Sequence, residues 1–97
     1  MKIALFLIDE KIGSDNPEVM PIIVLHVQGQ LVAEVEKEII VKKDINYLSL
    51  WLLTNKIKEI YVQDIDPIIK LLFEKLGVVV CRHEDIEKKP VLKRFLS

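Results

Sequence analysis

Apolar positions along this chain form two patterns: short runs typical of strands, and three-to-four-residue spacings typical of helices. The first run, residues 2–9, is apolar on both faces, which predicts a central strand covered on both sides. Two further runs, 22–28 and 31–41, are separated by a polar break around Gly29, which predicts a hairpin. Three glutamates share one face of the run at 31–41, a pattern typical of an edge strand.

The middle of the chain changes from strands to a helix. Residues 10–20 are rich in turn formers and predict a loop, after which Pro21 opens the second strand. Asp44 is typical of a helix N-cap, and the apolar spacing over 45–55 predicts a helix behind it. Residues 57–63 then predict a fourth strand.

A second helix follows at the Asp66-Pro67 pair. The residue before a proline is pushed out of the helical region, and proline itself fits the first helical turn. Gly77 is a natural left-handed terminator for this helix. The wholly apolar residues 78–81 predict a short buried parallel strand, and the charged stretch 84–97 predicts a helical tail.

The resulting order is β-β-β-α-β-α-β with a C-terminal helical tail. The first three strands predict an antiparallel meander, whereas the last two need right-handed helical crossovers and therefore run parallel. This is the plan of the ribonuclease-H-like α/β fold, a mixed five-stranded sheet with order 3-2-1-4-5. We expect residues 1–97 to form a single domain, since the chain shows no internal repeat and no linker.

Composition narrows the function classes. Fifteen acidic and fourteen basic residues leave a net charge of −1, which argues against a nucleic-acid partner. With 51% hydrophobic residues, the chain is not disordered overall. Its single cysteine excludes an internal disulfide, and no apolar run is long enough for a signal peptide or a membrane span. We therefore expect a cytoplasmic protein with no membrane partner.

Residues 45–81 resemble the dinitrogenase iron–molybdenum cofactor-binding family, whose pattern here is helix, strand, turn, helix, glycine and a closing apolar strand. The opening MKIALFLID is also similar to that family's first strand. The matching positions of the second half are Ile65, Pro67, Leu72, Leu76 and Gly77. The resemblance implies the same ribonuclease-H-like fold and a role in carrying or inserting nitrogenase metal clusters.

The cluster-binding motifs of that family are absent from this chain. Its glycine-rich turn is replaced by Gln-Asp-Ile-Asp at 63–66, where acidic side chains repel an anionic ligand. Its His-Phe-Gly stretch after the first strand has no counterpart in residues 10–20, which contain neither histidine nor cysteine. No cofactor is therefore predicted, except as a metal cluster that the resemblance alone implies.

Four carboxylates define a candidate ligand pocket, because the carboxyl ends of neighbouring parallel strands meet at one edge of a sheet. Asp9 and Glu10 follow the first strand, and Asp64 and Asp66 follow the fourth. Such a group could bind Mg²⁺ for phosphodiester hydrolysis. The alternative is that these acids are solvated loop formers, with Asp66 serving as a helix N-cap.

Cys81 and His83 are candidate metal ligands, since alternation along a strand would place both side chains on one face. Two ligands do not complete a zinc site, and His26 lies on the second strand, which two other strands separate from the fifth in the predicted order. The alternative is a buried thiol and a partly buried imidazole, both common in proteins.

Several large apolar residues lie off the inward stripes of their predicted helices and suggest self-association. They are Tyr47, Leu50, Leu53, Leu71, Phe73, Phe95 and Leu96. A monomer rarely leaves so much apolar surface in water, so we expect a homodimer. The alternative is that the tail covers the second helix.

The sequence therefore predicts a small non-catalytic accessory or interaction protein. Its first alternative is an iron–sulfur or iron–molybdenum cluster carrier. The second is a metal-dependent phosphodiesterase that uses the strand-end carboxylates.

Overall fold

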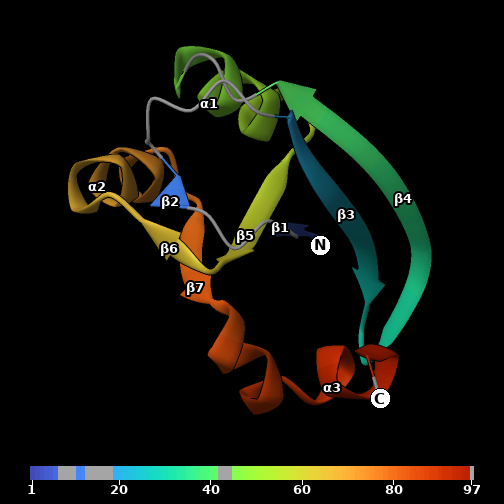
Figure 1. Ribbon diagram of the computed structural model, residues 1–97. Helices are drawn as coiled ribbons and strands as arrows, with labels where there is room; N and C mark the ends of the chain where they lie inside the picture. The colour runs from blue at the N-terminus through green and yellow to red at the C-terminus, as the bar shows by residue number, and fades with distance from the viewer. Residues whose placement is uncertain (7–10, 13–18, 42–44, 97) are drawn as a thin grey trace.

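Five strands form one mixed sheet through the centre of the molecule (Figure 1). The computed structural model describes residues 1–6, 11–12, 19–41 and 45–96. The strands of this sheet are, in chain order, β1 (Lys2–Phe6), β3 (Val19–Gln28), β4 (Leu31–Val41), β5 (Ile57–Val62) and β7 (Val79–Arg82). Their spatial order is β4-β3-β1-β5-β7, which confirms the predicted order 3-2-1-4-5.

The strand directions also agree with the ribonuclease-H-like plan. β1 pairs with β3, and β3 with β4, in antiparallel fashion. β1 pairs with β5, and β5 with β7, in parallel fashion. β1 is therefore central, and β4 is an edge strand, as its three glutamates predicted.

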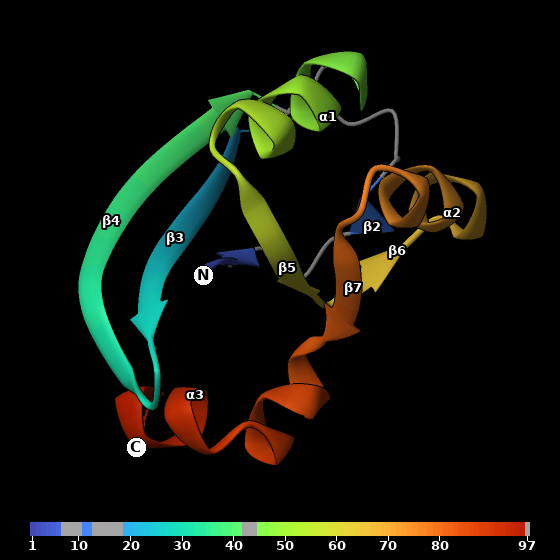
Figure 2. The same ribbon diagram turned by 180° about the vertical axis from the view of Figure 1, so that it is seen from behind.

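Helices cover the sheet on both faces (Figures 1 and 2). α1 (Ile45–Thr54) and α2 (Pro67–Lys75) are the crossovers that lead to β5 and β7, and both pack on one face. The 3₁₀ helix η1 (His83–Lys88) and α3 (Pro90–Leu96) form the tail and pack on the other. β1 lies between these layers and is buried on both faces from Ile3 to Phe6, which explains its continuous apolar character.

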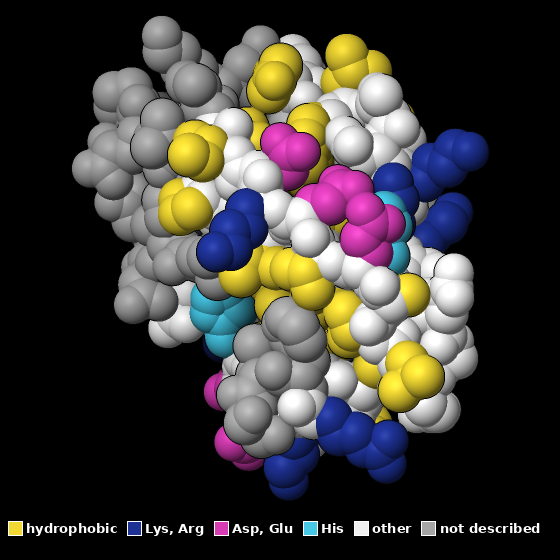
Figure 3. Space-filling model, turned by 90° about the vertical axis from the view of Figure 1, so that its right-hand side faces the viewer, with side chains coloured by type: hydrophobic (Ala, Val, Ile, Leu, Met, Phe, Trp, Pro, Cys, Tyr) yellow, Lys and Arg dark blue, Asp and Glu magenta, His cyan; other side chains and the backbone are white. Residues whose placement is uncertain are grey.

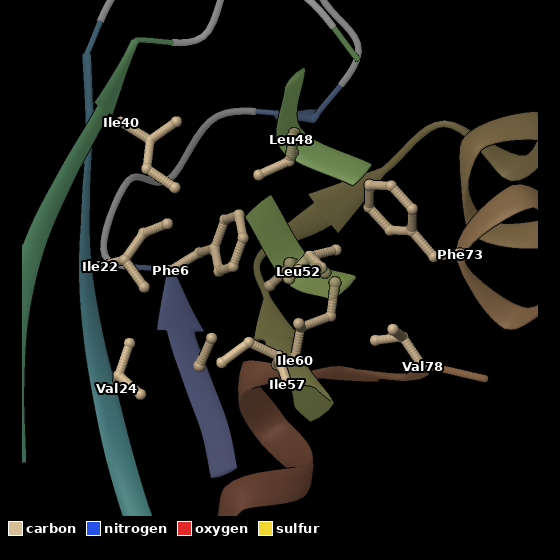
Figure 4. Close-up of a cluster of buried hydrophobic side chains, with 12 residues drawn as sticks. Phe6, Ile22, Val24, Ile40, Leu48, Leu52, Ile57, Ile60, Phe73 and Val78 are labelled. Atoms are coloured by element: carbon tan, nitrogen blue, oxygen red, sulfur yellow. The ribbon is translucent and has the colours of Figure 1, made fainter. Parts of the chain in front are cut away.

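The first core lies between the sheet and the two crossover helices. Figure 4 shows Phe6 from β1 pointing toward Leu52 of α1, with Phe73 of α2 reaching in from the opposite side. Its fully buried residues are Ala4, Phe6, Ile22, Val24, Ile40, Leu48, Leu52, Ile57, Ile60, Val62, Phe73 and Val78. The second core, under the tail, contains Ile3, Leu5, Leu25, Val27, Tyr61 and Leu92.

The ends of α2 form as the sequence predicts. The Asp66 carboxylate accepts a hydrogen bond from the Ile68 N–H at 2.9 Å, and Pro67 occupies the first turn. Gly77 follows the helix with a φ of 87°, a left-handed conformation that costs glycine little. The predicted cap of α1, Asp44, lies outside the described residues.

The packing face of α2 differs from the prediction. The spacing of the apolar residues predicts an inward stripe of Ile65, Ile68, Ile69, Leu72 and Leu76. Of these, Ile68 is 77% exposed and Leu72 is 38% exposed, whereas the other three pack against the core. Phe73, which was placed on the self-association surface, is fully buried, so that prediction is wrong. The helix is rotated relative to the prediction because Phe73 has helical spacing with Ile69 and Leu76 and is the bulkiest side chain that α2 can bury.

Two further differences lie in the segments predicted as loops. β3 begins at Val19 rather than at residue 22, so that Pro21 lies within the strand, opposite Ile39 of β4. A second, two-stranded parallel sheet joins β2 (Lys11–Ile12) to β6 (Asp64–Ile65). Two-residue strands carry too little pattern to be predicted from alternation.

Candidate functional site

The topology brings together the loop after β1 and the turn after β5, as the predicted ligand pocket requires. The β2–β6 pairing sets Lys11 opposite Asp64 and Ile12 opposite Ile65. Asp9 and Glu10 lie outside the described residues. The described half of the pocket is therefore Asp64 and Asp66.

These two carboxylates are engaged in local hydrogen bonds. Asp64 Oδ1 accepts from the Ile65 N–H at 2.9 Å, and Asp66 Oδ1 accepts from the Ile68 N–H at the N-terminus of α2. Within the described residues, neither belongs to a group of three potential metal ligands. The structure thus gives Asp66 the structural role of an N-cap, which was the alternative to a metal-dependent hydrolase.

A small cleft lies at this edge of the sheet, beside the start of α2. Its volume is about 200 Å³, below the range of sites that enclose an organic cofactor. The lining residues are Val62, Asp64, Ile65, Pro67, Lys70, Val80, Cys81 and Arg82. One acidic and two basic side chains give it mixed charge, rather than the all-acidic character that the four predicted carboxylates imply.

Cys81 lies beside a partly buried polar cluster on the tail side of the sheet. The hydroxyl of Tyr61 donates to Glu59 Oε2 at 3.3 Å, and Lys89 Nζ donates to Glu59 Oε1 at 2.7 Å. Burial, followed by the negative charge of Glu59, raises the pKa of the Cys81 thiol. Burial also raises the pKa of Tyr61 far above its ordinary value. A protonated thiol is a poor nucleophile and a poor metal ligand.

Cys81 and His83 are not presented by one continuous strand, which corrects the geometry expected for this pair. β7 ends at Arg82, and His83 is the first residue of η1. The Asp85 carboxylate accepts a hydrogen bond from the Arg82 N–H at 3.1 Å, which helps to turn the chain into the 3₁₀ helix. This hydrogen bond, together with Lys88, lowers the pKa of Asp85.

A different group of potential metal ligands lies on the β3–β4 hairpin. One ligand atom each from His26, Glu34 and Glu36 lies within 4.8 Å of the other two. Figure 3, which looks onto the β4 edge, shows acidic side chains gathered beside a histidine. The sequence pattern indicates His26 and the glutamate face separately and does not predict that they lie together.

The exposed apolar residues of α1 and α2 form what we term the outer helical surface. It consists of Tyr47 (54% exposed), Leu50 (62%), Leu53 (47%), Ile68 (77%) and Leu71 (59%). Of the seven residues predicted for self-association, the structure exposes Tyr47, Leu50, Leu53 and Leu71 and buries Phe73. The side chains of Phe95 and Leu96 lie outside the described part of the chain.

The sheet order and the two helical layers define the class of protein, an α/β domain of the ribonuclease-H-like type. No family model matches the chain, and no curated protein matches it. A solved structure described as the crystal structure of PH0822 is similar, with a TM-score of 0.67 and 16% sequence identity. The match covers 99% of this chain and 88% of that chain. At this identity the likeness shows the fold alone.

The described helices are short. None of them is long and apolar enough to cross a membrane.

Proposed function

We propose that this chain is a cytoplasmic, non-catalytic interaction module that pairs with a second copy of itself through the outer helical surface. The observation that carries the proposal is the composition of α1, INYLSLWLLT, which contains no charged residue. Only Leu48 and Leu52 of this helix are buried. A helix that packs one face on a sheet ordinarily has charged residues on its opposite face.

The spacing of the exposed residues suits a contact between helices. Tyr47, Leu50 and Leu53 recur every three residues and therefore lie along one side of α1. Fully burying a large apolar side chain stabilises an interface by roughly 1.5–3 kcal/mol, and partly exposed side chains contribute correspondingly less. Several such residues are therefore needed to offset the entropy lost on association.

The size of the contact explains why both helices take part. A helix of ten residues is about 15 Å long, so a contact between two copies of α1 alone is smaller than a standard interface. Ile68 and Leu71 of α2 extend the surface from the neighbouring helix. A two-fold axis would place the same apolar patch on both sides, and a net charge of −1 gives little repulsion between copies.

The test is a pair of charge substitutions with a matched control. Leu50→Glu with Leu71→Glu places two carboxylates in the proposed interface, and the expected result is a monomer by light scattering after size exclusion. Leu31→Glu is the control, because Leu31 is 69% exposed but lies on β4, outside the surface. The control should keep the mass of the wild type. If the double variant also keeps the wild-type dimer mass, the dimer uses another surface.

A second candidate is a carrier of an iron–sulfur or iron–molybdenum cluster, which the family resemblance implies. The observation that favours it is the β2–β6 pairing, because it joins the two segments from which the ligands of such a cluster would come. The acidic turn with Asp64 and Asp66 argues against an anionic cluster at that place. Metal analysis of protein purified without oxygen decides the question: stoichiometric iron or molybdenum supports the carrier, and its absence excludes it.

A further inference from the structure

The β3–β4 hairpin carries a histidine and two carboxylates on one face of the sheet. His26 lies directly opposite Glu34, and Glu36 lies opposite the neighbouring residue on that face, Val24. His26 Nδ1 is 4.0 Å from Glu34 Oε2, and His26 Nε2 is 3.2 Å from Glu36 Oε1. The imidazole is therefore flanked by a carboxylate at each of its nitrogens.

One ring nitrogen of His26 is a buried polar atom without a hydrogen bond. His26 Nε2 is shielded from solvent and has no hydrogen-bond partner, since its approach to Glu36 does not have hydrogen-bond geometry. A buried nitrogen left in this state is costly. The 3.2 Å separation is nevertheless close to the distance of about 3.3 Å between two ligand atoms of a tetrahedral ion with bonds of about 2.0–2.1 Å.

We propose that His26, Glu34 and Glu36 bind a divalent transition-metal ion of the Zn²⁺ class. Imidazole nitrogen with carboxylate oxygen is a donor set that suits Zn²⁺ better than Mg²⁺ or Ca²⁺, which prefer oxygen ligands alone. The side chains of Glu34 and Glu36 are 63% and 42% exposed, so they can turn inward by rotamer changes without disturbing the core. Three protein ligands leave one position for water or a group of another molecule.

The surroundings of the site are compatible with a cation. Glu38 lies on the same face, opposite Ile22, and adds negative charge farther along β4. Lys2 of β1 is opposite His26 on its other side and is the basic residue that would compete with the metal ion for the glutamates. The side chain of His26 is 22% exposed and therefore mostly buried, whereas the carboxylates of Glu34 and Glu36 remain accessible to solvent.

The experiment is titration of tag-free full-length protein with ZnCl₂, followed by calorimetry and by competition with a chromophoric zinc indicator. The expected result is one Zn²⁺ per chain for the wild type. His26→Gln and Glu36→Gln should each weaken binding by roughly tenfold or more, because each removes a direct ligand. His83→Gln and Glu38→Gln are the controls, since they remove the other histidine and a glutamate of the same face. Both controls should bind like the wild type.

The proposal is overturned if the wild type binds no Zn²⁺, or if binding survives unchanged in His26→Gln and Glu36→Gln. It is also overturned if His83→Gln lowers the affinity as much as His26→Gln, because the metal ion would then be held elsewhere. Circular dichroism of each variant separates loss of a ligand from loss of fold. The outcome is independent of the oligomeric state, which is measured separately.

Discussion

At the scale of single residues, the polar cluster of Glu59, Tyr61 and Lys89 shows how the fold sets chemical reactivity. Tyr61 is fully buried, yet its hydroxyl has a partner in Glu59, whose other oxygen accepts from Lys89. The carboxylate is thus paired, as a nearly buried charge must be. Burial, followed by the negative charge of Glu59, raises the pKa of the phenol and of the neighbouring Cys81 thiol. Both shifts favour the protonated form of these side chains.

These raised pKa values predict that the protein loses stability at alkaline pH. The unfolded chain releases the thiol proton above about pH 8.5 and the phenol proton above about pH 10, whereas the folded protein retains both. The folded state then binds more protons, so the free energy of unfolding falls as pH rises through this range. One phenol contributes up to about 1.4 kcal/mol per pH unit. Urea denaturation from about pH 8 to about pH 11 measures the slope.

The matched variants assign this slope to Tyr61. Tyr61→Phe removes the buried phenol and should flatten the alkaline decline. Tyr47→Phe alters a tyrosine that is 54% exposed on α1 and should leave the decline as in the wild type. An equal slope in wild type and Tyr61→Phe would contradict the assignment.

At the scale of elements, helix α2 shows where the pattern of apolar residues predicts the wrong packing face. Two stripes of apolar residues fit the helical period. The predicted inward stripe runs from Ile68 and Ile69 to Leu72 and Leu76, and the other shares Ile69 and Leu76 but adds Phe73. The sequence does not decide between them, because both are apolar. The structure buries the stripe with Phe73, which fills the space beside Leu52 of α1 (Figure 4). Shape complementarity between the helices determines which stripe is buried, and the sequence pattern does not contain that information.

This packing predicts very different costs for truncating a buried and an exposed side chain of α2. Phe73→Ala leaves a cavity in the first core and should lower the free energy of unfolding by about 3–5 kcal/mol. Leu71→Ala alters a side chain that is 59% exposed and should cost less than about 1 kcal/mol in the monomer. Urea denaturation at low protein concentration compares them. Similar losses for the two variants would mean that α2 is rotated relative to this structure.

The hairpin of β3 and β4 shows a second limit of sequence-based prediction. A two-residue turn at Gly29 pairs Gln28 with Leu31 and Val27 with Val32, as alternation predicts. Continued without interruption, this register would set His26 opposite Ala33, with Glu34 on the other face. A bulge between His26 and Val27 shifts the register by one residue and sets His26 opposite Glu34. The candidate zinc ligands therefore lie close together only because of this bulge, which the residue pattern does not predict.

At the scale of the whole molecule, the fold was predictable because its large elements agree with one another. The first strand is apolar on both faces, β4 carries the glutamates typical of an edge strand, and two helical crossovers lead to the last two strands. Together these features are compatible with few strand orders other than β4-β3-β1-β5-β7. The candidate site was less predictable. Asp64 does pair with Lys11 of β2, but the cleft that Asp64 lines is also lined by Lys70 and Arg82. Side-chain direction at strand ends depends on local turns that the period of the sequence does not fix.

The outer helical surface is also a property of the whole molecule. Apolar residues scattered singly over a protein need no explanation, but α1 lacks any charged residue and is joined by Ile68 and Leu71 of α2. Helices already lie on both faces of the sheet. Within the described residues, no further element of the chain covers the outer helical surface. In the proposed function, a second copy of the chain covers this surface.

Sedimentation equilibrium of the wild-type protein over a wide concentration range tests this claim most directly. The chain has a mass of 11.3 kDa, and the account predicts that the measured mass rises to twice this value as concentration increases. A mass that stays at 11.3 kDa at every concentration would contradict self-association through the helical layer.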